Sequence, residues 1–330
     1  MDTTIGITST IPVEILYAAG RRPVDLNNIF ITSADPVSLV RRAKMDGFPD
    51  TTCGWICGLY GTVLESGINT VVGVTGGDCS ETLALMEVLS HRGLCIIPFA
   101  YPHSRDRKLL KAELEKFAAQ FDVDIEAAEE VKRRLDAIRE RIHLLDTLLW
   151  RDNRATGEEV HLFQLASSDF EGNPDAFLEK LNTKIAEVET RNPSAPRLRL
   201  GYVGVPPILR DLYVQLEQNG ARVVYNEVQR QFSLPKPGPL MDSYYHYTYP
   251  YGIYARIDDI RREIARRRID GIIHYVQSFC FRGIEDIVLR ESIDVPVLTL
   301  QGDLPSRVTE IMQIRIEAFI DMLTRKKGRQ

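Results

Sequence analysis

Several features that would place this 330-residue chain in a common functional class are missing from its sequence. The formal net charge is −5, whereas a general nucleic-acid-binding protein needs an excess of Lys and Arg to neutralise phosphates. No apolar run is long enough for a transmembrane helix, and the first residues lack the basic segment and apolar core of a signal peptide. The sequence therefore predicts a cytoplasmic protein that binds neither nucleic acid nor a membrane.

Familiar nucleotide and zinc motifs are absent as well. The chain contains neither a P-loop pattern nor G-x-G-x-x-G. None of its five cysteines forms a C-x-x-C pair, which argues against a zinc ribbon or a thioredoxin motif. Cys53 and Cys57 form C-x-x-x-C, but a radical-SAM loop would need a third cysteine where Tyr60 stands. In the cytoplasm these cysteines are more reasonably reduced thiols or metal ligands than disulfides.

What the sequence does contain is a repeated alternation of strand and helix patterns, which is typical of parallel, doubly wound sheets. We therefore predict an α/β protein with two Rossmann-like (flavodoxin-like) parallel-sheet domains and a helical insertion. Strands are predicted at residues 28–32, 69–75, 94–99, 198–203, 221–226, 271–276 and 295–300. Helices are predicted at residues 11–20, 36–45, 54–66, 80–90, 208–219, 257–267, 284–291 and 308–323.

The middle of the chain differs from both ends. From residue 105 to about 191 it is highly charged and has apolar residues at helical spacing. The segment R-N-P-S-A-P at 191–196 is the clearest linker. We predict an N-terminal domain over 1–104 that carries Cys53 and Cys79. A helical segment with the linker follows over 105–195, and a C-terminal domain over 196–330 carries Cys280.

Three cysteines lie where a strand or loop pattern meets a helix pattern: Cys53, Cys79 and Cys280. Ligands collect at the carboxyl ends of strands in open α/β sheets, so these thiols could meet around one metal centre. Three thiolates can hold a [4Fe–4S] cluster with one iron left open. The alternative is that they are ordinary small buried residues, as free cysteines often are. Cys95, inside an apolar strand pattern, is predicted to be a core residue.

Six segments along the chain carry a resemblance to a known family. They are P-V-E-I-L-Y-A-A-G-R-R-P-V-D-L, C-G-W-I-C-G-L-Y-G, V-V-G-V-T-G-G-D-C, R-I-D-G-I-I-H-Y-V-Q-S-F-C, V-P-V-L-T-L-Q-G-D and Q-I-R-I-E-A-F. Together they resemble the 2-hydroxyacyl-CoA dehydratase and benzoyl-CoA reductase family, specifically its component D type iron–sulfur subunits. The resemblance covers nearly the whole chain, including the helical middle.

The resemblance implies an enzyme subunit, a lyase that removes water from a CoA thioester by radical chemistry. It implies one [4Fe–4S] cluster per chain, with Cys53, Cys79 and Cys280 as ligands. It also implies a dimer, with a related subunit or with itself, and a separate ATP-dependent activator that delivers one low-potential electron. The electron would convert the thioester into a ketyl radical anion. Some relatives hold a double-cubane cluster on six cysteines, which five cysteines cannot supply.

Departures and alternatives remain at this stage. Cys57 has no ligand role in the family pattern, and the second site reads G-D-C-S where threonine–cysteine–aspartate is usual. A benzoyl-CoA reductase-like enzyme, a small-molecule reductase and a non-catalytic electron-relay subunit are alternative functions. The sequence does not indicate the catalytic acid and base or the acyl group, and single histidines such as His246 and His274 are more often structural than catalytic.

Residues 244–254, with six tyrosines, fit a pocket, a subunit interface or loop packing. Residues 261–268 fit a solvated helix face, or a contact with CoA phosphates or with an acidic partner.

Overall fold

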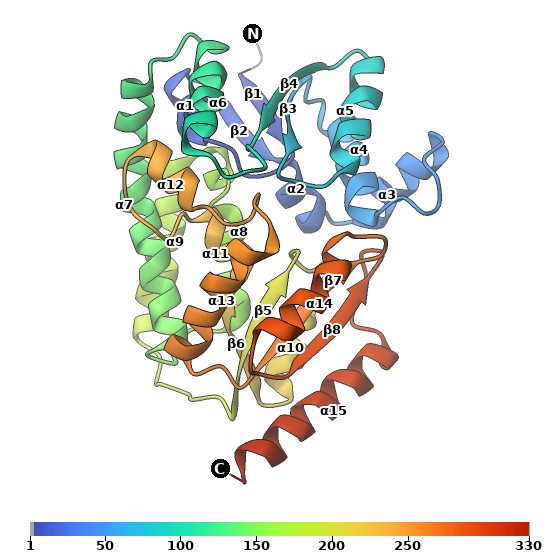
Figure 1. The fold of residues 1–330 in the computed structure, drawn as a ribbon, viewed down its shortest axis with the longest axis vertical. Helices are drawn as coiled ribbons and strands as arrows, with labels where there is room; N and C mark the ends of the chain where they lie inside the picture. Colours follow the sequence, from blue (N-terminus) through green and yellow to red (C-terminus); the bar gives the residue numbers. More distant parts are fainter. Residues whose placement is uncertain (1–2, 330) are drawn as a thin grey trace. The chain divides into compact units, whose positions relative to one another are not determined.

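The computed structural model describes residues 3–329, and the chain forms two compact units. Unit 1 comprises Met1–Arg141, Leu165–Leu181 and Gln231–Gly252, and unit 2 comprises Ile142–Gln164, Asn182–Arg230 and Ile253–Gln330. Each unit contains one parallel sheet flanked by helices (Figure 1). Among the helices of residues 3–329, none combines the length and the apolar character that crossing a membrane requires.

The sheet of unit 1 has four parallel strands in the order β2-β1-β3-β4. Its strands are β1 (Thr4–Ile7), β2 (Arg22–Asp25), β3 (Thr70–Gly76) and β4 (Cys95–Ala100). The helices within this unit are α1 (Val13–Ala18), α2 (Leu26–Thr32), α3 (Pro36–Met45), α4 (Gly54–Ser66), α5 (Glu81–His91), α6 (Arg107–Ala119) and α12 (Leu240–His246). The short helix η1 (Phe170–Gly172) also belongs to it.

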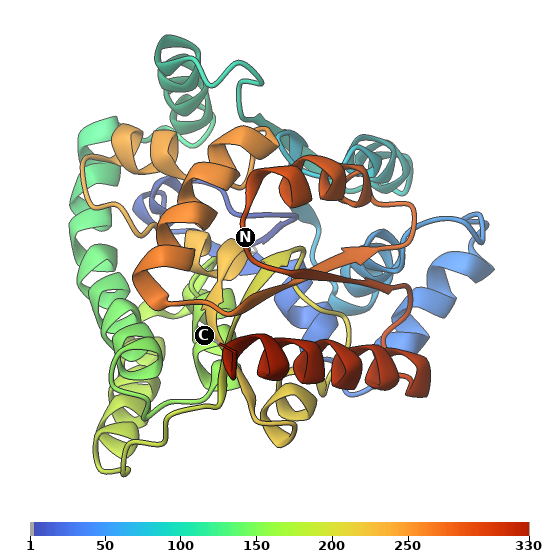
Figure 2. The same cartoon turned by 60° about the horizontal axis from the view of Figure 1, so that its bottom comes forward.

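The sheet of unit 2 repeats this topology in the order β6-β5-β7-β8, again with all strands parallel. Its strands are β5 (Leu198–Gly204), β6 (Ala221–Asn226), β7 (Gly271–Gln277) and β8 (Val297–Gly302). Figure 2 shows α13 and α14 on one face of this sheet and α10 and α15 on the other. These helices are α10 (Leu212–Gln218), α13 (Ile253–Arg267), α14 (Arg282–Ser292) and α15 (Glu310–Lys327).

The predicted fold class is confirmed, and so is the helical character of the middle of the chain. That region forms α6, α7 (Ile125–Trp150), α8 (Gly157–Ala166) and α9 (Pro174–Glu189), and α11 (Glu227–Phe232) follows β6. In both sheets the chain order reverses beside the first strand, so each unit has a switch point of the kind where doubly wound proteins bind ligands. In unit 2 the third strand, β7, is buried along its whole length.

One predicted strand is wrong. Residues 28–32 belong to α2, whose N-cap Asp25 accepts a hydrogen bond from the Asn27 amide at 2.9 Å. Leu26 and Phe30, one helical turn apart, are its buried residues. The β-branched run N-I-F-I-T favoured a strand, but the side-chain cap and this spacing stabilise the helix. The short strands β1 and β2 were not predicted.

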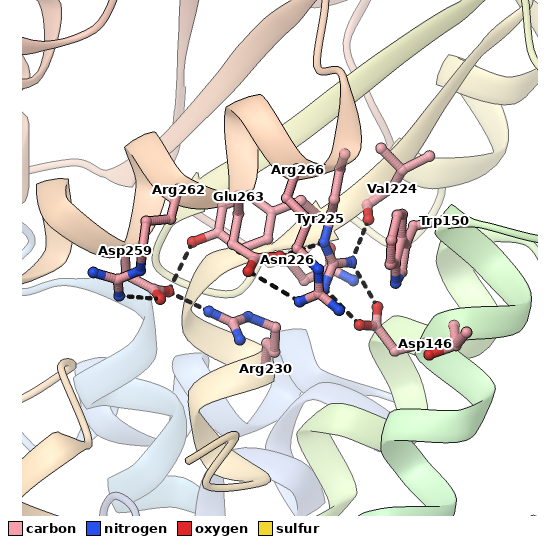
Figure 3. A network of polar contacts seen from close by, with 12 residues as sticks. Asp146, Trp150, Val224, Tyr225, Asn226, Arg230, Asp259, Arg262, Glu263 and Arg266 are labelled. Carbon is pink, nitrogen blue, oxygen red and sulfur yellow. Dashed lines mark hydrogen bonds and ion pairs between the residues drawn. The ribbon is translucent and has the colours of Figure 1, made fainter.

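Helix α13 also departs from the prediction of a solvated arginine face. Arg267 is 1% exposed, and its two terminal nitrogens donate to the Asp146 carboxylate of α7 at 2.8 and 2.6 Å. It also donates to the backbone oxygen of Val224 in β6 at 2.6 Å. Figure 3 labels Asp146 and Val224, and dashed lines mark the contacts that their oxygens accept. Arg262, by contrast, is more than half exposed. The inner side of α13 is therefore held to α7 and β6 by a buried, charge-balanced contact.

Candidate metal centre

Cys79 lies in the turn that joins β3 to α5, three residues after the strand and two residues before the helix. Its carbonyl accepts a hydrogen bond from the Thr82 amide at 3.1 Å. The backbone amide of Glu81, in the first turn of α5, is a hydrogen-bond partner of its sulfur. Because amides at a helix N-terminus stabilise negative charge, this position suits a thiolate.

Cys53 takes a comparable position at the start of α4. It is the N-cap residue of this helix, it is buried, and its carbonyl accepts from the Cys57 amide at 3.1 Å. Cys57 lies one turn further along, fully buried, with its sulfur 3.8 Å from the Thr52 carbonyl. Cys57 thus lies on the buried side of α4.

The Cys79 thiol lies in a surrounding that favours its protonated form. Burial and the neighbouring Asp78 carboxylate raise the pKa of the Cys79 thiol to about 12, and the charge of Cys53 acts in the same direction. Since a metal ligand must be a thiolate, metal binding here would release a proton and depend on pH.

The tyrosine-rich segment packs on the turn before Cys79. Tyr249 donates a hydrogen bond from its hydroxyl to Asp78 Oδ1 at 3.2 Å. A Cβ atom on Gly77 would lie only 2.6 Å from the Cβ of Pro250, and Gly77 has a φ of +88°. This turn therefore requires glycine for two reasons, its backbone conformation and the closeness of the tyrosine-rich segment.

A buried ion pair also contacts the tyrosine-rich segment. Tyr244 donates to Glu14 Oε2 at 2.8 Å, and Arg139 donates to Glu14 Oε1 at 2.7 Å. All three side chains are buried. Glu14 comes from the opening P-V-E-I-L motif, but its partners are 125 and 230 residues away in the sequence. Sequence reasoning missed this contact because no local pattern marks such distant partners.

Cys280 occupies in unit 2 the position that Cys79 occupies in unit 1. It lies three residues after β7 and two residues before α14, and its carbonyl accepts from the Gly283 amide at 3.0 Å. When T-V-V-G-V-T-G-G-D-C is aligned with G-I-I-H-Y-V-Q-S-F-C by the strand ends, the cysteine is the one identical position. Two sheets with the same strand order thus present a cysteine at the same place.

His274 is a structural residue of β7. It is buried, and its Nδ1 lies 2.7 Å from Asp286 Oδ1 of α14. Asp286 also accepts a hydrogen bond from the Thr299 hydroxyl of β8 at 2.6 Å. The histidine therefore joins β7 to α14, as the structural interpretation of this residue predicts.

The prediction that Cys95 is a core residue is wrong. Cys95 is exposed at the first position of β4, and β4 is an edge strand that pairs with β3 alone. Since the strands are parallel, Cys95 lies at the amino edge of the sheet, whereas Cys79 follows the carboxyl edge. Its exposure and its distance from that edge make Cys95 a suitable control when the candidate ligands are substituted.

The donor set fits an iron–sulfur cluster. Thiolates are the usual ligands of such clusters, and the N-termini of α4 and α5 would help to offset their negative charge once a metal has displaced the thiol protons. Within residues 3–329, no group of three or more His, Cys, Asp and Glu side chains is gathered closely enough to hold a metal ion. The convergence of Cys280 with Cys53 and Cys79 stays a prediction.

The fold and the cysteine turns define a class, an α/β protein with two Rossmann-like sheets and a cysteine after the third strand of each. The family described as 2-hydroxyglutaryl-CoA dehydratase, D-component, matches residues 8–323. The chain belongs to this family, which confirms the resemblance seen in the sequence. The family description names a component of a dehydratase-type enzyme. No curated protein matches the chain.

Proposed function

We propose that the chain is the iron–sulfur subunit of a 2-hydroxyacyl-CoA dehydratase-like enzyme, with one [4Fe–4S] cluster on Cys53, Cys79 and Cys280. The observation that carries the proposal is the equivalent placement of Cys79 and Cys280 after the third strand of each sheet. The family match supports the reaction class, elimination of water from a CoA thioester. When bound, the cluster would supply one low-potential electron, and the protein supplies position and electrostatics.

The residues of unit 1 have three roles in this proposal. The N-termini of α4 and α5 offset the negative charge of two thiolates. Tyr249 holds the Asp78 carboxylate by a hydrogen bond, which fixes the turn next to Cys79. Burial raises the pKa of Tyr101 and Tyr244 well above the usual value, so these hydroxyls stay neutral hydrogen-bond donors at physiological pH.

Partners are part of the proposal. We propose a cytoplasmic dimer, with a related subunit or a second copy of this chain, that receives its electron from an ATP-hydrolysing activator and binds a CoA thioester. An electron-relay subunit is the second candidate. It is considered because His274 is buried in this structure, which keeps this histidine from contact with a substrate. Turnover of a CoA thioester by the chain with activator and ATP, without a sister subunit, would overturn the relay alternative.

The ligand assignment is tested by iron and sulfide analysis of protein purified without oxygen. We expect about four irons per wild-type chain, because one [4Fe–4S] cluster contains that number. Cys280→Ser should lose most of the iron, since a ligand is removed. Cys95→Ser should keep it, since Cys95 is exposed at the other edge of the sheet. Equal iron content in the two variants would contradict the assignment.

A further inference from the structure

The turn that carries Cys280 is tied to the interior of unit 2 by a buried chain of ion pairs. Arg256, in the first turn of α13, is 0% exposed and donates to both carboxylate oxygens of Glu227, at 2.6 and 3.0 Å. Its remaining terminal nitrogen donates to Glu285, in the first turn of α14. Arg282 lies within 3.4 Å of the same Glu285 oxygen. Two arginines and two carboxylates thus form a charge-balanced group at the start of α14.

The other end of this chain of contacts reaches the sheet. Glu227 accepts a hydrogen bond from the Gly204 amide at 3.1 Å, where β5 ends. Gly204 has a φ of +101°, and a Cβ atom there would lie 2.1 Å from the backbone oxygen of Tyr275 in β7. Through Glu227, Arg256 therefore connects the carboxyl end of β5, which pairs with β7 at Tyr275, with the first turn of α14.

Electrostatics keep these groups charged. Burial by itself would raise the pKa of Glu227, but the Arg256 guanidinium outweighs burial and lowers it. Buried ion pairs of this kind add little net stability compared with apolar residues, and they are unfavourable when one partner is missing. What such a group does provide is a defined geometry, because an arginine fork and a carboxylate fit in few orientations.

The segment between β7 and α14, which carries Cys280, is short and strained, so its conformation depends on the neighbouring structure. Phe279 has a φ of +61°, a conformation that residues other than glycine rarely adopt. The Cys280 amide donates to the Gln277 carbonyl at 3.1 Å, and the Cys280 carbonyl accepts from Gly283 in α14. A strained backbone persists only where neighbouring structure holds it. The first turn of α14, held through Glu285, is that neighbouring structure.

We infer that Arg256, acting through Glu285, is a positioning residue that sets the place of the Cys280 sulfur. The inference rests on the proposed function, in which Cys280 is a cluster ligand. Groups that orient a metal ligand change metal affinity when they are altered, although they do not touch the metal.

The test uses two variants and a matched control in the full chain. Arg256→Lys keeps the charge and removes the two-pronged contact, and Glu285→Gln removes the acceptor charge without emptying the buried site. The control is Arg267→Lys, at the other end of the same helix and about 16 Å along it, given a rise of 1.5 Å per residue. Arg267 is equally buried and also makes a two-pronged contact, with Asp146.

Two readouts separate positioning from general destabilisation. In anaerobic protein, Arg256→Lys and Glu285→Gln should lose iron to a chelator about tenfold faster than wild type, while Arg267→Lys should match wild type. In metal-free protein, iodoacetamide should modify Cys280 several-fold faster in the first two variants only, as measured by mass spectrometry of the peptide.

The outcomes are distinguishable. Wild-type rates in both Arg256→Lys and Glu285→Gln would overturn the inference, and so would the same increase in Arg267→Lys. If Arg256→Lys fails to fold, the inference is tested by the iron-loss and alkylation rates of Glu285→Gln alone. A wild-type chain that holds no iron would overturn the proposed function, while the alkylation comparison would still show whether Arg256 positions Cys280.

Discussion

At the scale of single residues, His161 shows how burial determines ionisation. It is buried in unit 2, stacked on Tyr213 with ring centroids 4.6 Å apart. Its Nδ1 lies 3.1 Å from the Nε2 of Gln229. Burial lowers the pKa of His161 to about 3, so the native protein keeps this histidine neutral. An unfolded chain binds a proton at His161 near its ordinary pKa of 6.5.

The sign of the pH effect follows from this depressed pKa. The stabilising contribution of His161 is fully present above pH 6.5 and is lost as the pH falls toward 3. Between pH 6.5 and 5 we expect wild type to lose about 2 kcal/mol of unfolding free energy that His161→Gln does not lose. Urea unfolding at both pH values checks this. His91→Gln, at an exposed histidine, is the control, and an unchanged pH dependence in His161→Gln would contradict the expectation.

At the scale of elements, α3 and α4 pack closely at one glycine. Gly61 of α4 faces the backbone of α3, and a Cβ atom there would lie 2.3 Å from the Leu39 oxygen. The obstacle is backbone and not a flexible side chain, so the helices would have to separate. Gly61 belongs to the C-G-W-I-C-G-L-Y-G segment, and Cys53 caps the same helix. Close helix packing therefore explains the glycine that ends this segment.

Gly61→Ala should accordingly destabilise the protein by about 3 kcal/mol, because inserting a methyl group at a tight contact forces backbone shifts. Gly283→Ala is the matched control in α14, where the nearest atom to an added Cβ is Val276 at 4.0 Å. Alanine favours helix over glycine by about 1 kcal/mol, so this variant should be neutral or more stable. Denaturant unfolding of both variants is the measurement, and similar losses in the two would contradict the packing argument.

At the scale of the whole molecule, the chain combines two sheets of the same strand order, each with a cysteine after its third strand. It contains no P-loop pattern. The turns after β1 and β5 do not carry the G-x-G-x-x-G pattern that binds a nucleotide pyrophosphate. If ATP drives electron transfer to this chain, we expect a partner to consume it.

We expect the purified chain to show no ATPase activity of its own. With a family activator, ATP and a strong reductant, its iron–sulfur absorbance should bleach as the cluster takes up one electron. The same mixture without ATP is the control and should bleach far more slowly. ATP hydrolysis by the isolated chain, or equal bleaching without ATP, would show that the chain does not accept its electron from an activator.

Much of the fold was predictable because it depends on local periodicity. The helices at 36–45 and 54–66 and the strand at 221–226 begin and end as predicted. The exception at 28–32 shows the limit, since a β-branched run there is overridden by a cap at Asp25 and by burial of Phe30. The four-residue strands β1 and β2 are too short for a periodic signal.

The sequence by itself determined the fold class, the family and the identity of three candidate ligands, because strand ends and cysteine spacing are local properties of the chain. Only the tertiary structure decided that Cys95 is exposed, at the start of an edge strand. It also decided the partners of Arg256 and Glu14, which lie far away along the chain. The physical reason is that a buried charge is stable only beside its partner, and folding brings the two together from segments that share no sequence signal.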